Sequence, residues 1–314
     1  MKKRFALLTV LGALVMTTGC AFLSDLIDAS PWPWPAPKPS NYPSSSEPMR
    51  GILFTDLLVM KDLDGVRIDN GDLAKMRKKL NTIYGVLDLS VPITATVRQY
   101  VIHGRTETEI TDAAIQNMWR VYRQGFRLVV TPMNEPSVRS GESGYMGGFG
   151  HRPGLQSRDM YTNEQLAKEK AVWANLKKKV EKAGIPIYGA FLCLEPMDSR
   201  SVPFLKELGR YIRQDLKWDN IRLFSQGTRS AGWSDPGLRI EASPSCASYN
   251  DWCRQGIPNA DGMFQMNKES EAAAHMPTMT TCRPEWILYF PTLVSWGGGG
   301  APGKLEDWML KYIQ

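Results

Sequence analysis

The sequence is poor in residues that bind transition metals, and it contains no Cys-x-x-Cys pair. Its three histidines, His103, His151 and His275, are scattered along the chain, which argues against a zinc site. No internal apolar run reaches the roughly 18 residues of a membrane-spanning helix, so a protein with several spans is excluded. No Gly-x-Gly-x-x-Gly follows the first expected strand and no Gly-x-Ser-x-Gly occurs, which disfavours a dinucleotide-binding fold and a serine hydrolase.

The charge is also modest for a protein of 314 residues. The formal net charge is +6, and the three cations at residues 2–4 account for half of it. The remaining cations are dispersed along the sequence, which argues against nucleic acid as a partner. With 43% hydrophobic and 22% charged residues, the composition is that of an ordinary globular protein.

The N-terminus has the pattern of a targeting segment. Three cations at residues 2–4 precede a short apolar run at residues 5–16, and Thr17-Thr18-Gly19-Cys20 follows. Small residues before a cysteine resemble the bacterial lipobox, although Thr17 stands where leucine is usual. The resemblance implies a lipoprotein signal peptide over residues 1–19 and a lipid-modified Cys20 that anchors the chain to a membrane. An ordinary secretory signal and an uncleaved anchor are the alternatives.

Residues 20–50 are expected to form a lipid-attached, proline-rich tether. Seven prolines fall within residues 30–48, and such a run favours polyproline II over helix or sheet. The resemblance to lipoproteins, with Ala21 rather than Asp after the cysteine, favours the outer membrane, facing the periplasm or the cell surface. In that oxidising compartment Cys246 and Cys253 are close enough in sequence to pair, and Cys193 is expected to be a buried thiol.

From residue 51 to 314 apolar runs alternate with helical patterns, which predicts an α/β fold. The expected strands are residues 51–58, 93–102, 127–133, 185–194, 221–225, 238–242, 262–266 and 286–290. Eight strands with intervening helices suit one (β/α)₈ TIM-type barrel, irregular in its later strands, and an open doubly wound sheet is the alternative.

Four helices have recognisable patterns. Thr162 and Gln165 predict a capping box for a helix that ends at Gly184, and Thr111 caps another that ends at Gly125. A third helix begins near Ser201. The fourth is indicated by helical spacing of Leu73, Met76, Leu80 and Ile83.

Two glutamates follow two expected strands in the same manner. Glu135-Pro136 comes after the run at 127–133, and Glu195-Pro196 comes after the run at 185–194. Barrel enzymes carry their chemistry at the carboxyl ends of strands, and neighbouring strands lie about 4.8 Å apart. The two carboxylates are therefore expected within reach of one ligand.

Asn134-Glu135-Pro136 resembles the acid/base motif of the large clan of (β/α)₈ glycoside hydrolases that includes cellulases, mannanases and β-glycosidases. The resemblance implies that Asn134 binds the 2-hydroxyl of a sugar, that Glu135 protonates the leaving oxygen, and that a glutamate after strand 7 is the nucleophile. Glu269 is the nucleophile candidate by position, and Glu241 is the alternative.

The strand count departs from the clan's pattern. Asn134-Glu135 follows the third expected strand, whereas the fourth ends in Leu194-Glu195-Pro196. Either an early strand near residues 65–68 is missing from the count, or Glu195 is the acid/base and Asn134-Glu135 contacts the sugar beside it.

The sequence therefore predicts a membrane-anchored, glycoside hydrolase-like protein that cleaves or binds a polysaccharide or an envelope glycan. Tyr145, in a glycine-rich loop, is expected to close over the sugar, and Trp296 resembles the clan's strand 8 tryptophan. No cofactor or metal is expected, and the oligomeric state stays open. One alternative is a non-catalytic glycan-binding or scaffolding lipoprotein with a degenerate barrel. Another is a barrel enzyme that uses Lys268 or Lys304 on a phosphate or carbonyl.

Overall fold

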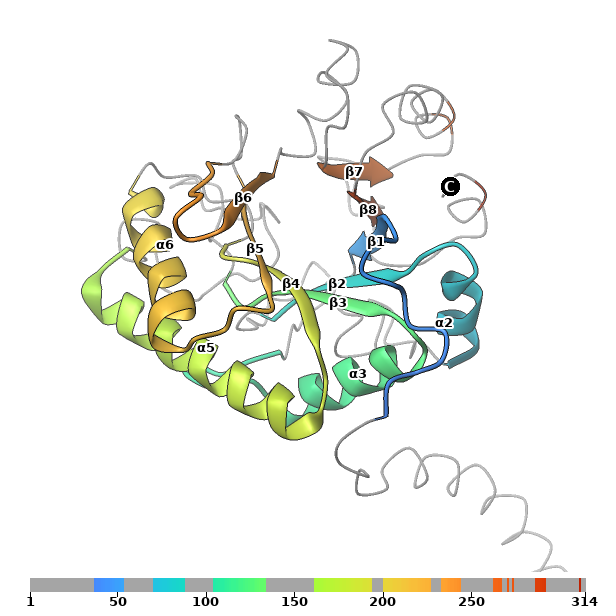
Figure 1. The fold of residues 1–314 in the computed structure, drawn as a ribbon, viewed down its shortest axis with the longest axis horizontal. Helices are drawn as coiled ribbons and strands as arrows, with labels where there is room; N and C mark the ends of the chain where they lie inside the picture. The colour runs from blue at the N-terminus through green and yellow to red at the C-terminus, as the bar shows by residue number, and fades with distance from the viewer. Residues whose placement is uncertain are drawn as a thin grey trace, which may run out of the picture.

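The fold is built on one curled, fully parallel sheet of eight strands (Figure 1). The computed structural model describes residues 37–53, 70–87, 104–133, 161–193, 200–226, 233–243, 262–266 and 286–291, with the single residues 270, 273 and 311. The strands are β1 (Met49–Leu53), β2 (Thr82–Val86), β3 (Arg127–Thr131), β4 (Ile187–Phe191), β5 (Arg222–Gln226), β6 (Ile240–Ser243), β7 (Gly262–Met266) and β8 (Trp286–Pro291). Their order in the sheet is β6-β5-β4-β3-β2-β1-β8-β7.

This topology confirms an α/β fold of the TIM-barrel type. Because every strand is parallel to its neighbours, all strands begin at one edge, here named the base, and end at the other, here named the carboxyl edge. No pairing among the described residues joins β6 to β7, so full closure of the barrel stays a prediction. The sequence places its irregular crossovers in this same part of the chain, between residues 226 and 260.

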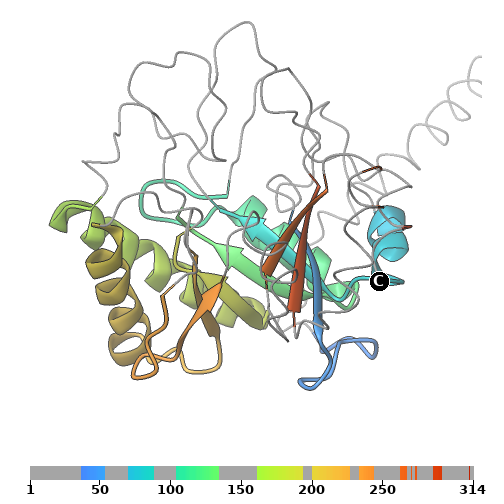
Figure 2. The same cartoon turned by 90° about the horizontal axis from the view of Figure 1, so that it is seen from above.

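Helices cover the outer face of the curled sheet (Figures 1 and 2). They are α2 (Asn70–Arg77), α3 (Asp112–Arg123), α5 (Asn163–Ala183) and α6 (Ser201–Arg210), which runs on into the π-helical turn η1 (Tyr211–Asp215). Each helix follows a strand and returns toward the base, so its C-terminus lies at the base. Among the described residues no helix has the length and apolar character needed to cross a membrane.

The helix ends follow from local sequence. The Thr162 hydroxyl accepts a hydrogen bond from the Gln165 backbone N–H at 3.2 Å, and the Thr111 hydroxyl accepts one from the Ala114 N–H at 3.2 Å. At the C-terminus of α5 the chain turns through Gly184 with a φ of 63°, a left-handed conformation that glycine adopts at little steric cost. These caps confirm the predicted boundaries.

The fourth predicted helix is wrong in its second half. α2 ends at Arg77, and Ile83 lies in β2, where it is paired with Ile52 of β1 and Leu128 of β3. Helical spacing of the apolar residues misled the prediction, because a short helix followed directly by a strand preserves that spacing by chance. The β-branched and aromatic residues of Thr-Ile-Tyr-Gly-Val are typical of a strand. The strand expected at 93–102, and the alternative at 65–68, lie outside the described residues.

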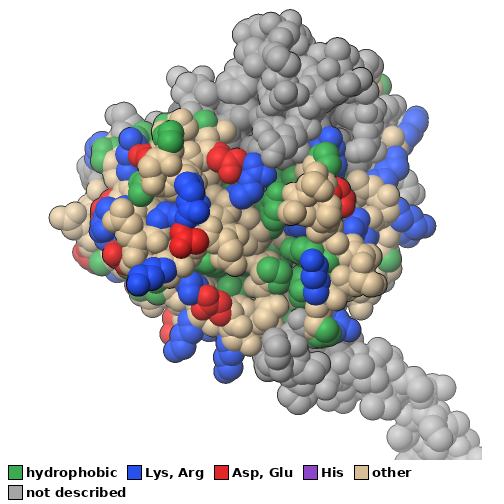
Figure 3. All heavy atoms as spheres, in the orientation of Figure 1, with side chains coloured by type: hydrophobic (Ala, Val, Ile, Leu, Met, Phe, Trp, Pro, Cys, Tyr) green, Lys and Arg blue, Asp and Glu red, His purple; other side chains and the backbone are tan. Residues whose placement is uncertain are grey.

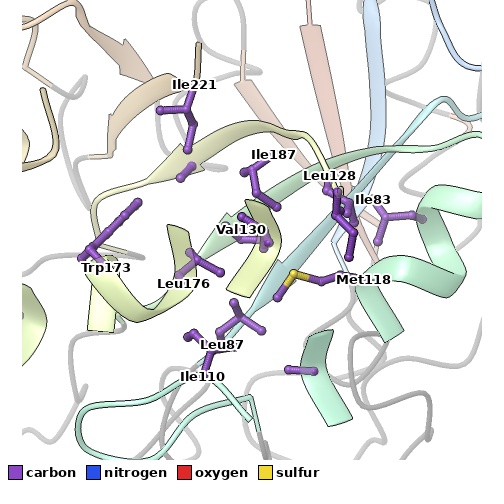
Figure 4. Close-up of a cluster of buried hydrophobic side chains, with 14 of the residues drawn as sticks. Ile83, Leu87, Ile110, Met118, Leu128, Val130, Trp173, Leu176, Ile187 and Ile221 are labelled. Carbon is purple, nitrogen blue, oxygen red and sulfur yellow. The ribbon is translucent and has the colours of Figure 1, made fainter. Parts of the chain in front are cut away.

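Two apolar layers hold the sheet in place. The outer layer fills the space between the strands and the helices, with side chains that include Leu128 and Val130 of β3 and Trp173 and Leu176 of α5 (Figure 4). The inner layer lies on the opposite face, where buried Tyr84, Phe191 and Phe224 form an aromatic stack with ring centroids 4.9 Å and 5.0 Å apart.

Gly189 of β4 makes room for this inner stack. A Cβ atom at residue 189 would lie 2.7 Å from Cε2 of the Phe224 ring, which is closer than real Cβ contacts. The aromatic stack therefore requires a residue without a side chain on the strand beside it.

The expected tether is in part a packed segment. Residues 37–48, the portion that the structure describes, lie across the base beneath β1, β2 and β3 (Figure 2). The Asn41 side-chain amide donates to the Gln124 carbonyl at 3.2 Å, and the Arg127 guanidinium donates to the Glu47 carbonyl at 2.9 Å. The chain is thus fixed to the base before it enters β1.

Candidate active site at the carboxyl edge

The ends of β3 and β4 are in register at the carboxyl edge. Val130 pairs with Ala190, after an irregularity between Leu128 and Val129 that moves the register by one residue. The final residues of the two strands, Thr131 and Phe191, therefore stand opposite each other. Strands β2 and β5 flank this pair on either side.

The Thr131 hydroxyl ties the two strand ends together. It lies 3.0 Å from the Phe191 carbonyl oxygen and 3.0 Å from the Met133 carbonyl oxygen, so its single proton is shared between two acceptors. Thr131 is fully buried, so these bonds form away from water. The backbone of residues 131–133 is in this way held against the end of β4.

Backbone hydrogen bonds join the ends of β3 and β4 to the neighbouring strands β2 and β5. The Leu87 N–H donates to the Thr131 carbonyl at 2.8 Å, and the Leu192 N–H donates to the Phe224 carbonyl at 3.0 Å. The ends of β2, β3, β4 and β5 are thus hydrogen-bonded side by side.

A buried ion pair between Arg105 and Glu169 also holds the segment that follows β3. The Arg105 guanidinium lies 2.7 Å from Glu169 Oε2, and the two side chains are 1% and 0% exposed. Arg105 Nη1 also donates to the Pro132 carbonyl at 2.7 Å. The remaining guanidinium donors reach the carbonyls of Thr106 and Glu107 and the second Glu169 oxygen.

This ion pair is part of the positioning of the carboxyl edge, because Pro132 is two residues before Asn134. Arg105 comes from the segment before α3, and Glu169 comes from the second turn of α5. The pair therefore joins two crossover segments to the end of β3. Sequence reasoning missed it, although Glu169 falls beside Val172 and Trp173 on the apolar side of α5, and a charge on an apolar stripe signals a buried partner.

Glu241, the alternative nucleophile, lies among the described residues. It occupies the second position of β6, in register with Phe224 of β5, and Arg222 of β5 donates to it with Nε at 3.0 Å and with Nη2 at 2.5 Å. Arg222 Nη1 donates to the Tyr188 hydroxyl at 3.2 Å. Glu241 thus has an arginine partner, and its role as a nucleophile stays a prediction.

The other predicted site residues lie outside the described residues. These are Cys20, Asn134, Glu135, Tyr145, Glu195, Glu269 and Trp296, together with the alternative candidates Lys268 and Lys304 and the cysteines Cys246 and Cys253. The structure does describe residues that directly precede some of these candidates. Met133 and Cys193, just before the two Glu-Pro motifs, are both buried, as expected for Cys193. Met266, the last residue of β7, is three residues before Glu269.

In the described part of the chain, no three His, Cys, Asp or Glu side chains are grouped so that they could hold a metal ion. The polar groups that fasten the ends of β3 and β4 are backbone amides and carbonyls, the Thr131 hydroxyl and the Arg105–Glu169 ion pair. They can orient strand ends, and the ligand-binding groups have to come from the residues that follow those ends.

No protein-family profile and no curated protein matches the chain. Solved structures do share its fold. A family 5 xyloglucanase from Paenibacillus pabuli matches with a TM-score of 0.52 and 12% identity, over 85% of this chain and 98% of the other. The endo-1,4-β-mannanase of Rhizomucor miehei matches with a TM-score of 0.51 and 13% identity, over 85% and 93%.

The endo-β-1,4-mannanase of Thermotoga petrophila matches with a TM-score of 0.51 and 11% identity, over 86% of this chain and 77% of the other. The fold is therefore that of barrel enzymes in glycoside hydrolase family 5 and related mannanases. At these identities the likeness establishes the fold alone, because one fold hosts many activities.

Proposed function

We propose that this chain is a glycoside hydrolase that cleaves a polysaccharide or an envelope glycan at the carboxyl edge of its sheet. One observation carries the proposal. Thr131 and Phe191 stand opposite each other at the ends of β3 and β4, and Glu135 and Glu195 each follow by four residues. Because both glutamates follow paired strand ends by the same number of residues, we infer that their carboxylates lie on one side of the barrel.

The strand positions assign the roles. Glu195 follows β4, the strand that carries the acid/base in the clan that the sequence resembles, and we assign it as the general acid. Asn134 and Glu135 follow β3 and contact the sugar beside it. Glu269, after β7, is the proposed nucleophile, and Tyr145 and Trp296 are the proposed sugar platforms.

The mechanism needs two carboxyl groups in different protonation states. The protonated Glu195 donates its proton to the leaving glycosidic oxygen, while an ionised carboxylate attacks the anomeric carbon or activates water. The aromatic stack of Tyr84, Phe191 and Phe224 gives the inside of the sheet an apolar floor. An apolar floor favours the protonated form of a carboxyl group above it, which suits a proton donor.

The proposal includes attachment to a membrane. Cys20 carries the lipid, residues 1–19 are removed, and the protein belongs to the cell envelope, at the outer membrane facing the periplasm or the surface. The support is the sequence pattern at residues 2–20 together with the proline-rich stretch that follows it.

The test is the pair Glu195→Gln and Glu135→Gln, assayed on aryl glycosides and on mannan and xyloglucan. Loss of a general acid lowers kcat on a glycan by about 10²–10⁴-fold, and each variant should keep the melting temperature of the parent. Glu181→Gln, in an exposed ion pair with Lys177 on α5, is the matched control and should leave turnover unchanged. Unchanged turnover in both carboxyl-edge variants would overturn the proposal.

A glycan-binding protein without turnover is the second candidate. Leu194 stands where the resembled motif has asparagine, so the strand 4 position lacks the amide that binds the sugar's 2-hydroxyl. This candidate predicts that titration calorimetry detects binding of oligosaccharides while prolonged incubation leaves them intact.

A further inference from the structure

The base of the sheet gathers cations that the sequence scatters. Four helices end at the base with basic residues in or just after their last turn. The exposed cations there are Lys38, Lys75, Lys78, Lys79, Arg123, Lys178, Lys182, Lys217 and Arg239. Figure 3, which views the molecule from this end, shows Lys and Arg side chains around the rim of the face.

Acidic side chains do not balance this face. The exposed acids at the base are Glu47, Glu181, Asp215 and Asp219. Three of them already have cations close by: Glu181 is paired with Lys177, Asp215 with Arg210 and Asp219 with Arg239. A surplus of exposed positive charge therefore remains at the base.

The carboxyl edge shows no such surplus among the described residues. Its exposed acids are Glu107, Glu109 and Glu164, with Arg200 as an exposed cation, and Lys168 lies 3.7 Å from Glu107 and 3.1 Å from Glu164. The described part of the molecule therefore carries its surplus of exposed positive charge at the base. Charges at helix ends explain part of this pattern, because cations stabilise helix C-termini.

The chain also enters the domain at the base. Residues 38–48 cross it, and the Arg77 guanidinium, which donates to the Asn41 carbonyl at 2.7 Å, holds that segment in place. Beside it, Glu47, Arg50, Arg77, Lys78 and Lys79 line a hollow of about 280 Å³. A tether that leads from a membrane to residue 38 therefore delivers the basic face, and not the carboxyl edge, to the membrane.

We propose that the base docks on an anionic lipid surface and so points the carboxyl edge away from the membrane, toward the glycan. Lys and Arg near a membrane are attracted to anionic headgroups over about one Debye length, and a lipid-attached chain stays within that range. The proposal rests on the proposed membrane attachment and does not depend on the proposed chemistry.

Lysine footprinting tests the orientation. The full-length chain is reconstituted in vesicles of equal parts phosphatidylcholine and phosphatidylglycerol, or of phosphatidylcholine alone, and is labelled with a water-soluble amine reagent. On the anionic vesicles labelling of Lys178 and Lys182 should fall about threefold or more, while labelling of Lys168 and Lys170 is unchanged. All four lysines lie on α5, so the helix is its own control.

Charge reversal supplies the second arm. Lys78→Glu with Lys79→Glu should remove the protection of Lys182 on anionic vesicles, and so should high salt. Lys168→Glu, at the far end of α5, is the matched control and should leave the protection intact.

Equal labelling at both ends of α5, equal protection on the two lipids, or protection by soluble heparin but not by vesicles would overturn the proposal. The intact mass of the purified chain reports acylation of Cys20 separately. Turnover of a soluble oligosaccharide, measured without vesicles, separates failure of the docking from failure of the hydrolase.

Discussion

The two ends of the sheet each contain an Arg–Glu pair, and the pairs differ in their access to water. At the carboxyl edge the side chains of Arg105 and Glu169 are 1% and 0% exposed. At the base those of Arg222 and Glu241 are 24% and 43% exposed. The two Arg–Glu pairs therefore have different structural roles. The buried pair fastens crossover segments to the end of β3, while the wetter pair joins two strands where they begin.

The Arg222–Glu241 pair shows that burial and hydrogen bonding have opposite effects on the pKa of an arginine. Burial lowers the pKa of the Arg222 guanidinium, but its hydrogen bonds to Glu241 and Tyr188 outweigh this effect and leave the pKa raised. Arg222 is therefore a permanent cation beside Glu241.

The largest effect should come from breaking the buried pair. Glu169→Leu leaves the Arg105 guanidinium buried without a counter-charge, which should lower the free energy of unfolding by about 3–5 kcal/mol. Chemical denaturation measures the loss. Glu241→Gln, in the exposed pair at the base, is the matched control and should cost about 1 kcal/mol or less.

The double variant Arg105→Met with Glu169→Leu sharpens this test. It removes both charges, so the penalty of an unpaired buried cation disappears and much of the lost stability should return. A double variant as unstable as Glu169→Leu would mean that the carbonyl contacts of Arg105, and not its charge pairing, hold the edge.

A smaller effect on stability is expected at the hydroxyl that links β3 to β4. Thr131→Val keeps the shape of the side chain and removes its bonds to the Phe191 and Met133 carbonyls, at a cost of about 1–3 kcal/mol. If this link sets the spacing of Glu135 and Glu195, kcat on a glycan falls while KM changes little. A kcat equal to that of the parent would show that the spacing is fixed by other contacts.

The smallest effect concerns an ion network between the two ends, where Glu207 of α6 meets Arg210 and Lys170. The hydrogen bonds from Arg210 and Lys170 lower the pKa of Glu207 to about 2. A carboxyl group with a lowered folded-state pKa stabilises the fold above its ordinary pKa, and this contribution disappears as the pH falls toward 2.

Glu207→Gln should therefore cost about 0.5 kcal/mol at neutral pH, reduced by solvent screening because the side chain is one-third exposed, and nothing near pH 2. Urea denaturation over a pH series measures this difference. Glu181→Gln, in the exposed pair with Lys177, is the control and should cost no more. A Glu207→Gln penalty that is constant with pH would contradict the assignment.

Much of the fold was predictable because it depends on short-range patterns. Thr111, Thr162 and Gly184 set helix ends through contacts within a few residues, and every strand except β2 overlaps an apolar run recognised in the sequence. β2 was missed because α2 and β2 adjoin without a turn signal, so that their apolar residues mimic one long helix.

By itself the sequence determined the capped helix ends, every strand except β2, and which two strands are followed by Glu-Pro. Neighbouring residues decide these features through caps, side-chain shape and hydrophobic period. Only the tertiary structure decided that Thr131 faces Phe191, that Glu241 turns to Arg222, and that Glu169 reaches Arg105. These contacts join residues 19 to 64 positions apart. Their partners are set by strand register and helix packing, which no local pattern encodes.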